Sequence, residues 1–292
     1  MADGPEPHPT ISRLQEIAGS VSSFVAPITL ISGILFYFGY VYTTTQYGYF
    51  GLDVDTIGLG TQEFIMRSPG PLLTPLLAAG LIAVVIGLAH AAVRRRIEVA
   101  SAEAPWRLRR FRRLALGCTA AGWVGLGVGA AMLFGYAVVG PLVPLYDLVA
   151  PSVLAVSAAT AIYAARLDRL LGRSRSRIVN VARYAVLTIS LLWATSTLAQ
   201  YTGRFAAMTL GQLRDRPSVV LDTKERLFLP TTTVQKVPLP TDKDQSFHFR
   251  YWNLRLLIQG KDKMFLVPSP WRRGDPTLVV PMNDQVRVQF LR

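Results

Sequence analysis

The stretch "PLLTPLLAAGLIAVVIGLAHAAVRRR", residues 71–96, decides the class of fold. Its first 23 residues contain no Asp, Glu, Lys or Arg, and the run ends at Arg94, Arg95 and Arg96. About 20 apolar residues in a helix cross the hydrocarbon core of a bilayer, and arginines gather at the cytoplasmic ends of such helices. The stretch therefore predicts a transmembrane helix whose carboxyl end lies in the cytoplasm.

Four further windows have the same character. Hydrophobic residues make up 51% of the chain and charged residues only 17%. Arg13 is the only basic residue before the first window and no small-residue cleavage site follows it, which favours an uncleaved helix over a signal peptide. We predict a cytoplasmic segment over residues 1–20 and a transmembrane domain over residues 21–203. The predicted fold is a bundle of about five transmembrane helices, at about 21–42, 71–93, 114–139, 148–165 and 184–203, followed by a small all-β domain.

Arginines fix the predicted orientation. Residues 166–183 contain six of them, whereas residues 43–70 contain only Arg67 and residues 140–147 contain no basic residue. The other arginine-rich link, residues 94–113, contains Arg94, Arg95, Arg96, Arg107, Arg109, Arg110, Arg112 and Arg113. The positive-inside rule places both rich links in the cytoplasm, so everything after about residue 204 is predicted to lie outside the membrane. The ratio of 26 Arg to 5 Lys is typical of a GC-rich bacterial genome, so we expect a bacterial plasma membrane.

Aromatic residues crowd the outer end of the first predicted helix and the loop that follows it. They are Phe36, Tyr37, Phe38, Tyr40, Tyr42, Tyr47, Tyr49 and Phe50. Aromatic rings favour the membrane interface, where an apolar face and a polar edge are both satisfied. Two interpretations remain open: the cluster only anchors the helix at the interface, or the loop also forms a packed platform beneath the external domain.

Small residues recur at four-residue spacing in two of the helices. The third helix has Gly117, Ala121, Gly125 and Gly129, and the second has Ala79, Ala83, Gly87 and Ala91. Membrane helices approach each other closely through such residues. We predict tight helix–helix contacts at both stripes, either within one chain or between copies in a homo-oligomer.

The tail, residues 204–292, predicts an extracytoplasmic β domain of five to seven short strands. In "SFHFRYWNLRLLIQ" the apolar residues change from odd to even positions, which predicts a bulge near Trp252–Asn253. "GKDK" (260–263) predicts a hairpin turn. The tail carries 15 basic and 8 acidic residues, whereas Asp53, Asp55 and Glu63 make the outer loop negative. A domain this small gains from an additional contact, and we expect the loop to dock beneath it, partly by opposite charge; anionic lipid or wall polymer is an alternative partner for the basic tail.

No motif in the sequence names a reaction. There is no phosphate-binding loop, dinucleotide fingerprint or zinc-protease helix, and the pair Asp53 and Asp55 is too few ligands for a metal site. We therefore expect no catalytic, cofactor or metal residues, and no nucleic-acid partner, because topology explains the arginines. The predicted function is non-enzymatic: the helices hold a β domain for partner binding or envelope sensing. The alternative is a transport or channel subunit whose path is lined by the polar fifth helix, with Thr188, Ser190, Thr195, Ser196, Thr197 and Gln200.

Two segments carry a resemblance to a family. At "FYFGYVYTTTQYGYFGLDVDTIGLGTQEFIMRS" and "FRYWNLRLLIQGKDKMFLVPSPW" the chain resembles a group of multi-span membrane proteins of Streptomyces-like actinobacteria. In that group an aromatic outer loop precedes several helices, and an extracytoplasmic β tail contains a similar strand. The resemblance covers about half of the chain. It implies an actinobacterial plasma-membrane protein and assigns no activity.

Overall fold

The computed structural model describes residues 9–103, 108–140, 145–172, 177–213, 216–229, 233–240 and 245–291. Within them, five helices are long and apolar enough to cross a membrane, and an antiparallel six-stranded sheet follows. The long helices are α1 (Pro9–Gly48), α4 (Pro69–Glu103), α5 (Leu108–Phe134), α7 (Tyr146–Leu170) and α8 (Arg177–Gly211). The chain is thus a multi-span membrane protein with a carboxyl-terminal β domain, which confirms the predicted fold class. It forms two compact units, Met1–Gly70 with Thr202–Arg292 (the sheet unit) and Pro71–Tyr201 (the helical unit).

Helix α1 is longer than the predicted transmembrane segment at both ends. It begins at Pro9, so residues 9–20 of the predicted cytoplasmic segment are helical, while residues 1–8 lie outside the described residues. It continues to Gly48 because no glycine or proline interrupts residues 40–47. The Thr43 and Thr45 hydroxyls donate to the carbonyls of Gly39 and Val41, so polar groups are satisfied within the helix. The first part of the predicted outer loop is therefore helix.

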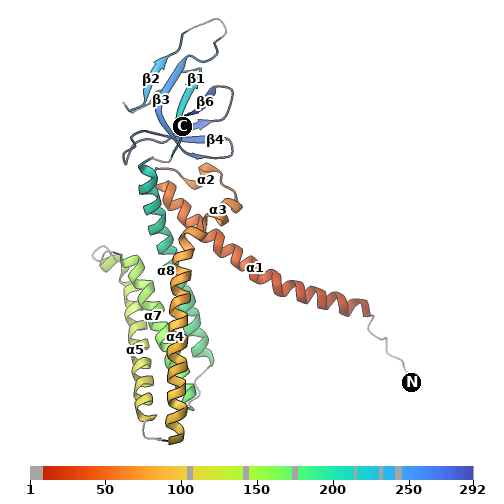
Figure 1. Ribbon diagram of the computed structural model, residues 1–292, viewed down its shortest axis with the longest axis vertical. Helices are drawn as coiled ribbons and strands as arrows, with labels where there is room; N and C mark the ends of the chain where they lie inside the picture. The colour runs from red at the N-terminus through yellow and green to blue at the C-terminus, as the bar shows by residue number, and fades with distance from the viewer. Residues whose placement is uncertain are drawn as a thin grey trace. The chain divides into compact units, whose positions relative to one another are not determined.

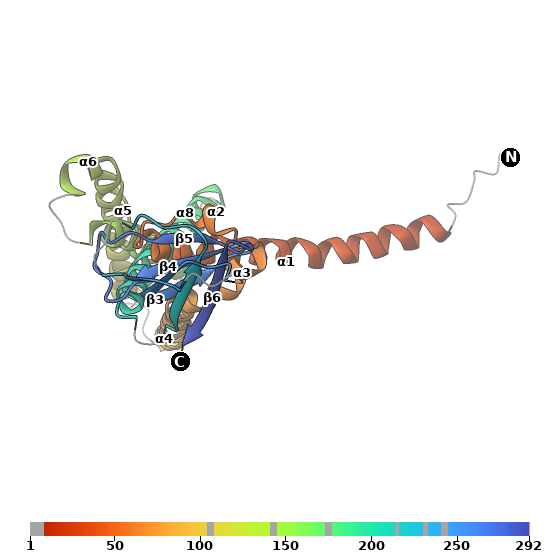
Figure 2. The same ribbon diagram turned by 90° about the horizontal axis from the view of Figure 1, so that it is seen from above.

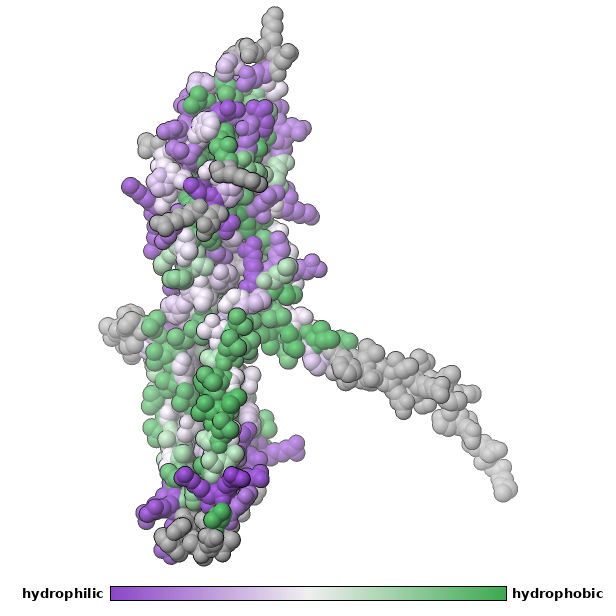
Figure 3. All heavy atoms as spheres, viewed as in Figure 1, coloured by the Kyte–Doolittle hydropathy of each residue, from purple (hydrophilic) through white to green (hydrophobic). Residues whose placement is uncertain are grey.

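In the helical unit, α5 and α7 pack closely along their lengths (Figure 1). Helix α4 joins them at the arginine-rich end, where Ile97 of α4, Ala115 of α5 and Leu167 of α7 form a buried cluster. Much of the remaining helix surface is apolar and exposed, including Leu81, Val85 and Leu88 of α4 (Figure 3). Lipid tails solvate such a surface as well as a protein interior does, so these faces need no protein cover.

The sheet has the order β5-β4-β3-β1-β6, with β2 also paired to β3 (Figures 1 and 2). Its strands are β1 (Ser218–Thr223), β2 (Gln235–Pro238), β3 (Phe249–Gln259), β4 (Lys263–Pro268), β5 (Leu278–Pro281) and β6 (Val286–Leu291). The predicted bulge is confirmed, because Val219 pairs with Leu254 while Leu221 pairs with Tyr251, and Asn253 between them has φ 63°. The predicted turn at 260–263 is also confirmed, since β3 and β4 form a hairpin there.

Each face of the central strands of the sheet carries a buried cluster. On one face, Val219, Leu221, Tyr251, Leu254 and Leu266 form a core that is closed by the side chains of Leu227 and Leu229. The segment "RLFLP" is irregular over its described residues 226–229, where the Tyr251 hydroxyl accepts the backbone N–H of Leu227 at 2.7 Å in place of a neighbouring strand. The other face packs against helices of the same unit, as described below.

Candidate functional site

An aromatic platform supports the second face of the sheet. Tyr47, Phe50, Leu52 and Ile57 from the end of α1 and from α2 (Val54–Ile57) share one buried cluster with Leu257, Ile258, Phe265 and Val267 of the sheet. Trp271 stacks on this cluster, with its ring centroid 4.6 Å from that of Phe50 and 5.5 Å from that of Tyr49. The structure therefore confirms the interpretation that the aromatic loop is a packed platform beneath the β domain.

Hydrogen bonds and close backbone contacts fix the sheet on this platform. The Thr277 hydroxyl donates to the Phe50 carbonyl at 2.8 Å. The Arg255 guanidinium donates to the carbonyls of Leu213 and Arg216, just beyond α8, at 2.6 and 2.7 Å. A Cβ on Gly260 would overlap the Ile57 carbonyl, so only glycine lets the β3–β4 turn approach α2 this closely. The sheet is thus held in one orientation by groups from both ends of the chain.

The remaining aromatic residues of α1 divide between packing and exposure. Phe36 and Tyr40 lie against Phe64 of α3 (Thr61–Arg67), each at a ring-centroid distance of 5.5 Å. Gly39 permits this, because a Cβ there would overlap the Phe64 carbonyl. Phe38 is buried and Tyr42 half-buried, while Tyr37 is exposed. Tyr37 is therefore the residue of this set best placed for the interfacial role.

Apolar contact, rather than an ion pair between described residues, holds the loop beneath the sheet. The Asp53 carboxylate accepts the backbone N–H of Asp55 and caps α2. Both aspartates are exposed, and within the described chain neither forms an ion pair with the tail. The cluster beneath the sheet is apolar instead, so burial of aromatic and aliphatic surface is the main attraction.

A buried carboxylate organises the sheet end that is distant from the platform. Asp222 of β1 is fully buried and accepts Arg250 Nε and Nη2 at 2.7 and 2.9 Å, and Arg287 Nη2 at 2.7 Å. The hydrogen bond from Arg250 is the main reason that the pKa of Asp222 lies below its usual value. Two guanidinium groups share one carboxylate, so the cluster keeps a net charge of +1.

Cations and aromatic rings alternate around this cluster. Arg226 lies 5.0 Å from the ring centroid of Phe228, Arg287 4.9 Å from Phe247 and Arg250 5.8 Å from Trp252. Phe228 is 84% exposed although it is a large apolar side chain. Since β3 rises about 3.3 Å per residue, Arg250 lies roughly 30 Å along the strand from Gly260, whose turn contacts the platform. We call this set, together with Lys236, the basic–aromatic end.

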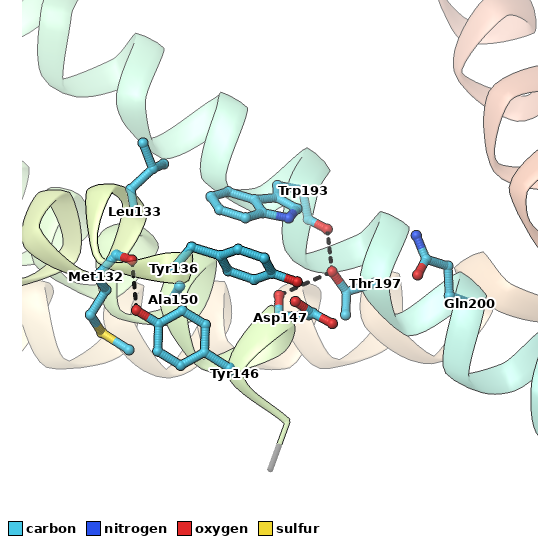
Figure 4. A pocket seen from close by; sticks show the side chains of 9 residues that line it. All are labelled: Met132, Leu133, Tyr136, Tyr146, Asp147, Ala150, Trp193, Thr197 and Gln200. Atoms are coloured by element: carbon cyan, nitrogen blue, oxygen red, sulfur yellow. Dashed lines mark hydrogen bonds between the residues drawn. The ribbon is translucent and has the colours of Figure 1, made fainter. Parts of the chain in front are cut away.

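A cavity lies in the helical unit, at the helix ends opposite the arginine-rich links (Figure 4). Its volume is about 460 Å³, and it is lined by Met132, Leu133, Tyr136, Tyr146, Asp147, Ala150, Trp193, Thr197 and Gln200. The Tyr146 hydroxyl donates to the Met132 carbonyl at 2.6 Å, which fixes its ring. The Thr197 hydroxyl lies 3.1 Å from the Asp147 carbonyl and 3.2 Å from the Trp193 carbonyl, and so joins α8 to α7.

The carboxylate of Asp147 lies next to the Tyr136 hydroxyl (Figure 4). This carboxylate raises the pKa of Tyr136, because it attracts the phenol hydrogen and would repel an ionised phenolate. No cation among the described residues pairs with Asp147. The local sequence around Asp147 does not indicate this cavity, because the lining residues come from segments far apart in the chain.

The two predicted small-residue stripes have different surroundings. A Cβ on Gly125 would overlap Ser157 Oγ and one on Gly129 would overlap Leu154, so these two glycines lie directly against α7. A Cβ on Gly117 would meet nothing within 4 Å, and Ala121 is exposed. Gly122 contacts α7 instead, because a four-residue spacing drifts about 40° around a helix at each step.

The stripe on α4 is exposed, and a Cβ on its Gly87 would meet nothing within 4 Å. Its members Ala79, Ala83, Gly87 and Ala91 are all exposed.

Of the predicted topology arginines, Arg107 lies outside the described residues. Arg94 forms an exposed ion pair with Glu98 at 3.0 Å. Arg110 and Arg113 are exposed at the start of α5.

The hydroxyl groups of the polar fifth helix are largely used inside the protein. Ser190, Ser196 and Thr197 are buried, and the Thr195 hydroxyl donates to the Leu191 carbonyl at 2.8 Å. Thr188 is exposed, and Gln200 lines the cavity. No group of three His, Cys, Asp or Glu side chains in the described ranges could hold a metal ion.

Comparison of the chain with family models, curated proteins and solved structures finds no match.

Proposed function

We propose that this is a non-enzymatic protein of an actinobacterial plasma membrane that presents its β domain outside the cell to an anionic partner of the envelope. The observation that carries the proposal is the basic–aromatic end. It combines exposed cations, an exposed Phe228 and a carboxylate cluster with net positive charge at the end of the sheet distant from the platform.

The platform supports this role because it orients the sheet. A domain on a flexible linker pays an ordering cost when it binds, whereas a preorganised surface does not. Here the apolar cluster around Phe50 and the bonds from Arg255 and Thr277 fix the sheet relative to the ends of α1 and α8. The arginine distribution supports the same arrangement, because it favours an outer location for everything after α8.

The chemistry of the basic–aromatic end favours a phosphate- or carboxylate-rich polymer. Guanidinium groups bind such groups through two parallel hydrogen bonds, and the flanking rings offer flat apolar surface to sugar or glycerol units. The tail as a whole carries 15 basic against 8 acidic residues, which draws polyanions toward it at low salt.

Binding of a poly(glycerol phosphate) to the full chain in nanodiscs of neutral lipid tests the proposal. We expect saturable binding that weakens with salt and falls at least fivefold in the double variant Arg226→Gln, Lys236→Gln. The matched control is Arg272→Gln, Arg273→Gln, which removes the same charge near the platform. Equal losses in both double variants would reduce the effect to net charge and contradict a defined site.

The alternative, a transport or channel subunit, has one observation in its favour. The outer part of α8 supplies Thr197 and Gln200 to a cavity that contains a carboxylate. Ion flux through reconstituted liposomes that is lost in Gln200→Leu, and kept in Thr188→Val, would support this alternative against the first proposal.

A further inference from the structure

We propose that the cavity around Asp147 binds an organic ammonium group, either the headgroup of an aminophospholipid or a soluble amine. The proposal concerns the helical unit and does not depend on the function proposed for the β domain. It rests on the side chains that line the cavity and on how they are held.

The first step is charge. Among the described residues that line the cavity, Asp147 supplies the one carboxylate, and none is Lys or Arg. The neighbour of its side chain is the neutral hydroxyl of Tyr136. A carboxylate offers about four lone-pair sites, so one phenol leaves acceptor positions free. The cavity therefore favours a cation and disfavours an anion.

The second step is the aromatic wall. Tyr136, Tyr146 and Trp193 all line the cavity, and the rings of Tyr136 and Tyr146 meet edge to face with centroids 5.7 Å apart. Figure 4 shows the Trp193 and Tyr136 rings on the side of the cavity next to Asp147. Several rings around one carboxylate make up the kind of site that recognises alkylammonium groups, because each ring face attracts a cation without demanding a hydrogen bond.

The third step is preorganisation and size. Tyr146 is buried and fixed by its bond to Met132, and Thr197 fixes α8 to the first turn of α7 beside Asp147. These contacts hold three separate elements in place without using the Asp147 carboxylate. A volume of about 460 Å³ lies within the range of about 300–1,000 Å³ that small-ligand sites occupy. Met132, Leu133 and Ala150 add an apolar side that suits the carbon chain next to an ammonium group.

Asp147 also lies in the first turn of α7, where an acidic residue is favoured by the helix dipole alone. That role explains a carboxylate at this position. It does not explain the three rings or the open volume around the carboxylate, and these are what a ligand would use.

The test uses the purified full chain and two kinds of probe. Radiolabelled choline and ethanolamine report soluble amines, and native mass spectrometry of protein from nanodiscs reports retained phosphatidylethanolamine against phosphatidylglycerol. We expect Asp147→Asn to weaken ammonium binding about tenfold or more, and Trp193→Leu to weaken it about threefold to tenfold. The matched controls are Asp284→Asn and Trp123→Leu, which change an exposed aspartate and an exposed tryptophan elsewhere and should leave binding unchanged.

A neutral isostere separates recognition of charge from burial of apolar volume. 3,3-Dimethylbutanol has the shape of choline without its charge, and it should compete at least tenfold more weakly than choline. Thermal unfolding of each variant shows whether the protein is folded, so that lost binding is not mistaken for lost structure.

Each outcome decides the proposal. Retention of phosphatidylethanolamine that depends on Asp147, without choline binding, identifies a lipid headgroup as the ligand, and the reverse pattern identifies a soluble amine. Absence of saturable binding by every ammonium probe, equal binding by folded Asp147→Asn, or equal competition by the neutral isostere would overturn it.

Discussion

The substitution Asp222→Asn tests how the β domain is stabilised. It preserves the shape of a fully buried side chain but replaces a charged acceptor of four guanidinium contacts with a neutral amide, half of which is a donor. At least one guanidinium N–H group then faces the amide NH2 of Asn, which is also a donor. The remaining hydrogen bonds go to a neutral amide oxygen in place of a charged carboxylate.

The magnitude follows from the exposure of the partners. Breaking a buried ion pair costs about 3–5 kcal/mol, but the side chains of Arg250 and Arg287 are 26% and 48% exposed, so water solvates them in part. We therefore expect the free energy of unfolding of the sheet to fall by about 2–3 kcal/mol. Arg287→Gln, which leaves the contact between Arg250 and Asp222 in place, should cost about 1 kcal/mol.

The pH dependence has a defined sign. The pKa of Asp222 is lower in the folded protein than its ordinary value of 3.8. The stabilisation is therefore complete above the unfolded pKa and is lost as the pH falls through the folded pKa. We expect wild-type stability to begin to decline below about pH 5, and this part of the decline to be absent in Asp222→Asn.

Hydrogen exchange of the full chain in detergent measures these effects. A loss of about 2–3 kcal/mol corresponds to roughly 30- to 150-fold faster exchange in peptides that cover β1 and β3. Asp284→Asn, in the exposed turn between β5 and β6, is the control. Unchanged protection in Asp222→Asn, or an acid decline identical to that of the wild type, would refute the reasoning.

Two further substitutions test the packing of each unit. Gly125→Leu should destabilise the helical unit by about 1–3 kcal/mol in detergent thermal unfolding, because its Cβ would overlap Ser157. Gly127→Leu on the same helix meets open space and should be tolerated. Equal stability of the two variants would argue against the α5–α7 contact. Phe50→Ala should cost about 3–5 kcal/mol and make the tail sensitive to protease, because Phe50 is 3% exposed beneath the sheet. Asp55→Asn should leave the tail resistant, and a loss of resistance equal to that of Phe50→Ala would restore a role for charge.

The sequence predicted the helices well because their signal is long and local. A run of 20 or more uncharged residues has few alternative structures, and arginines mark its cytoplasmic ends. The bulge at Trp252–Asn253 was also predictable, because a change in alternation within one strand requires an extra residue. A second irregularity between Leu256 and Ile258 was missed, since the run "LRLLIQ" keeps apolar residues at even positions and disguises the shift at Leu257.

The site features were harder to predict because they depend on distant partners. Asp222 and Arg287 are 65 residues apart, and only strand pairing brings them together. The contact between α5 and α7 was predicted only in part. Gly122, Gly125 and Gly129 share one face of α5, because they are spaced by three and four residues. The predicted four-residue pattern instead included Gly117 and Ala121, which point away from α7. The cavity combines residues from α5, α6 (Tyr136–Val139), α7 and α8, so no local pattern indicates it.

The side of the membrane on which the β domain lies is the central claim, and single-cysteine labelling of intact cells tests it most directly. In a Cys118→Ala background, Asp284→Cys places a thiol in an exposed turn of the sheet, and Arg96→Cys places one in an arginine-rich link. A membrane-impermeant maleimide should label the cysteine at position 284 on intact cells, and the one at position 96 only after permeabilisation. Labelling at position 96 on intact cells, with position 284 protected until the cells are opened, would contradict the account.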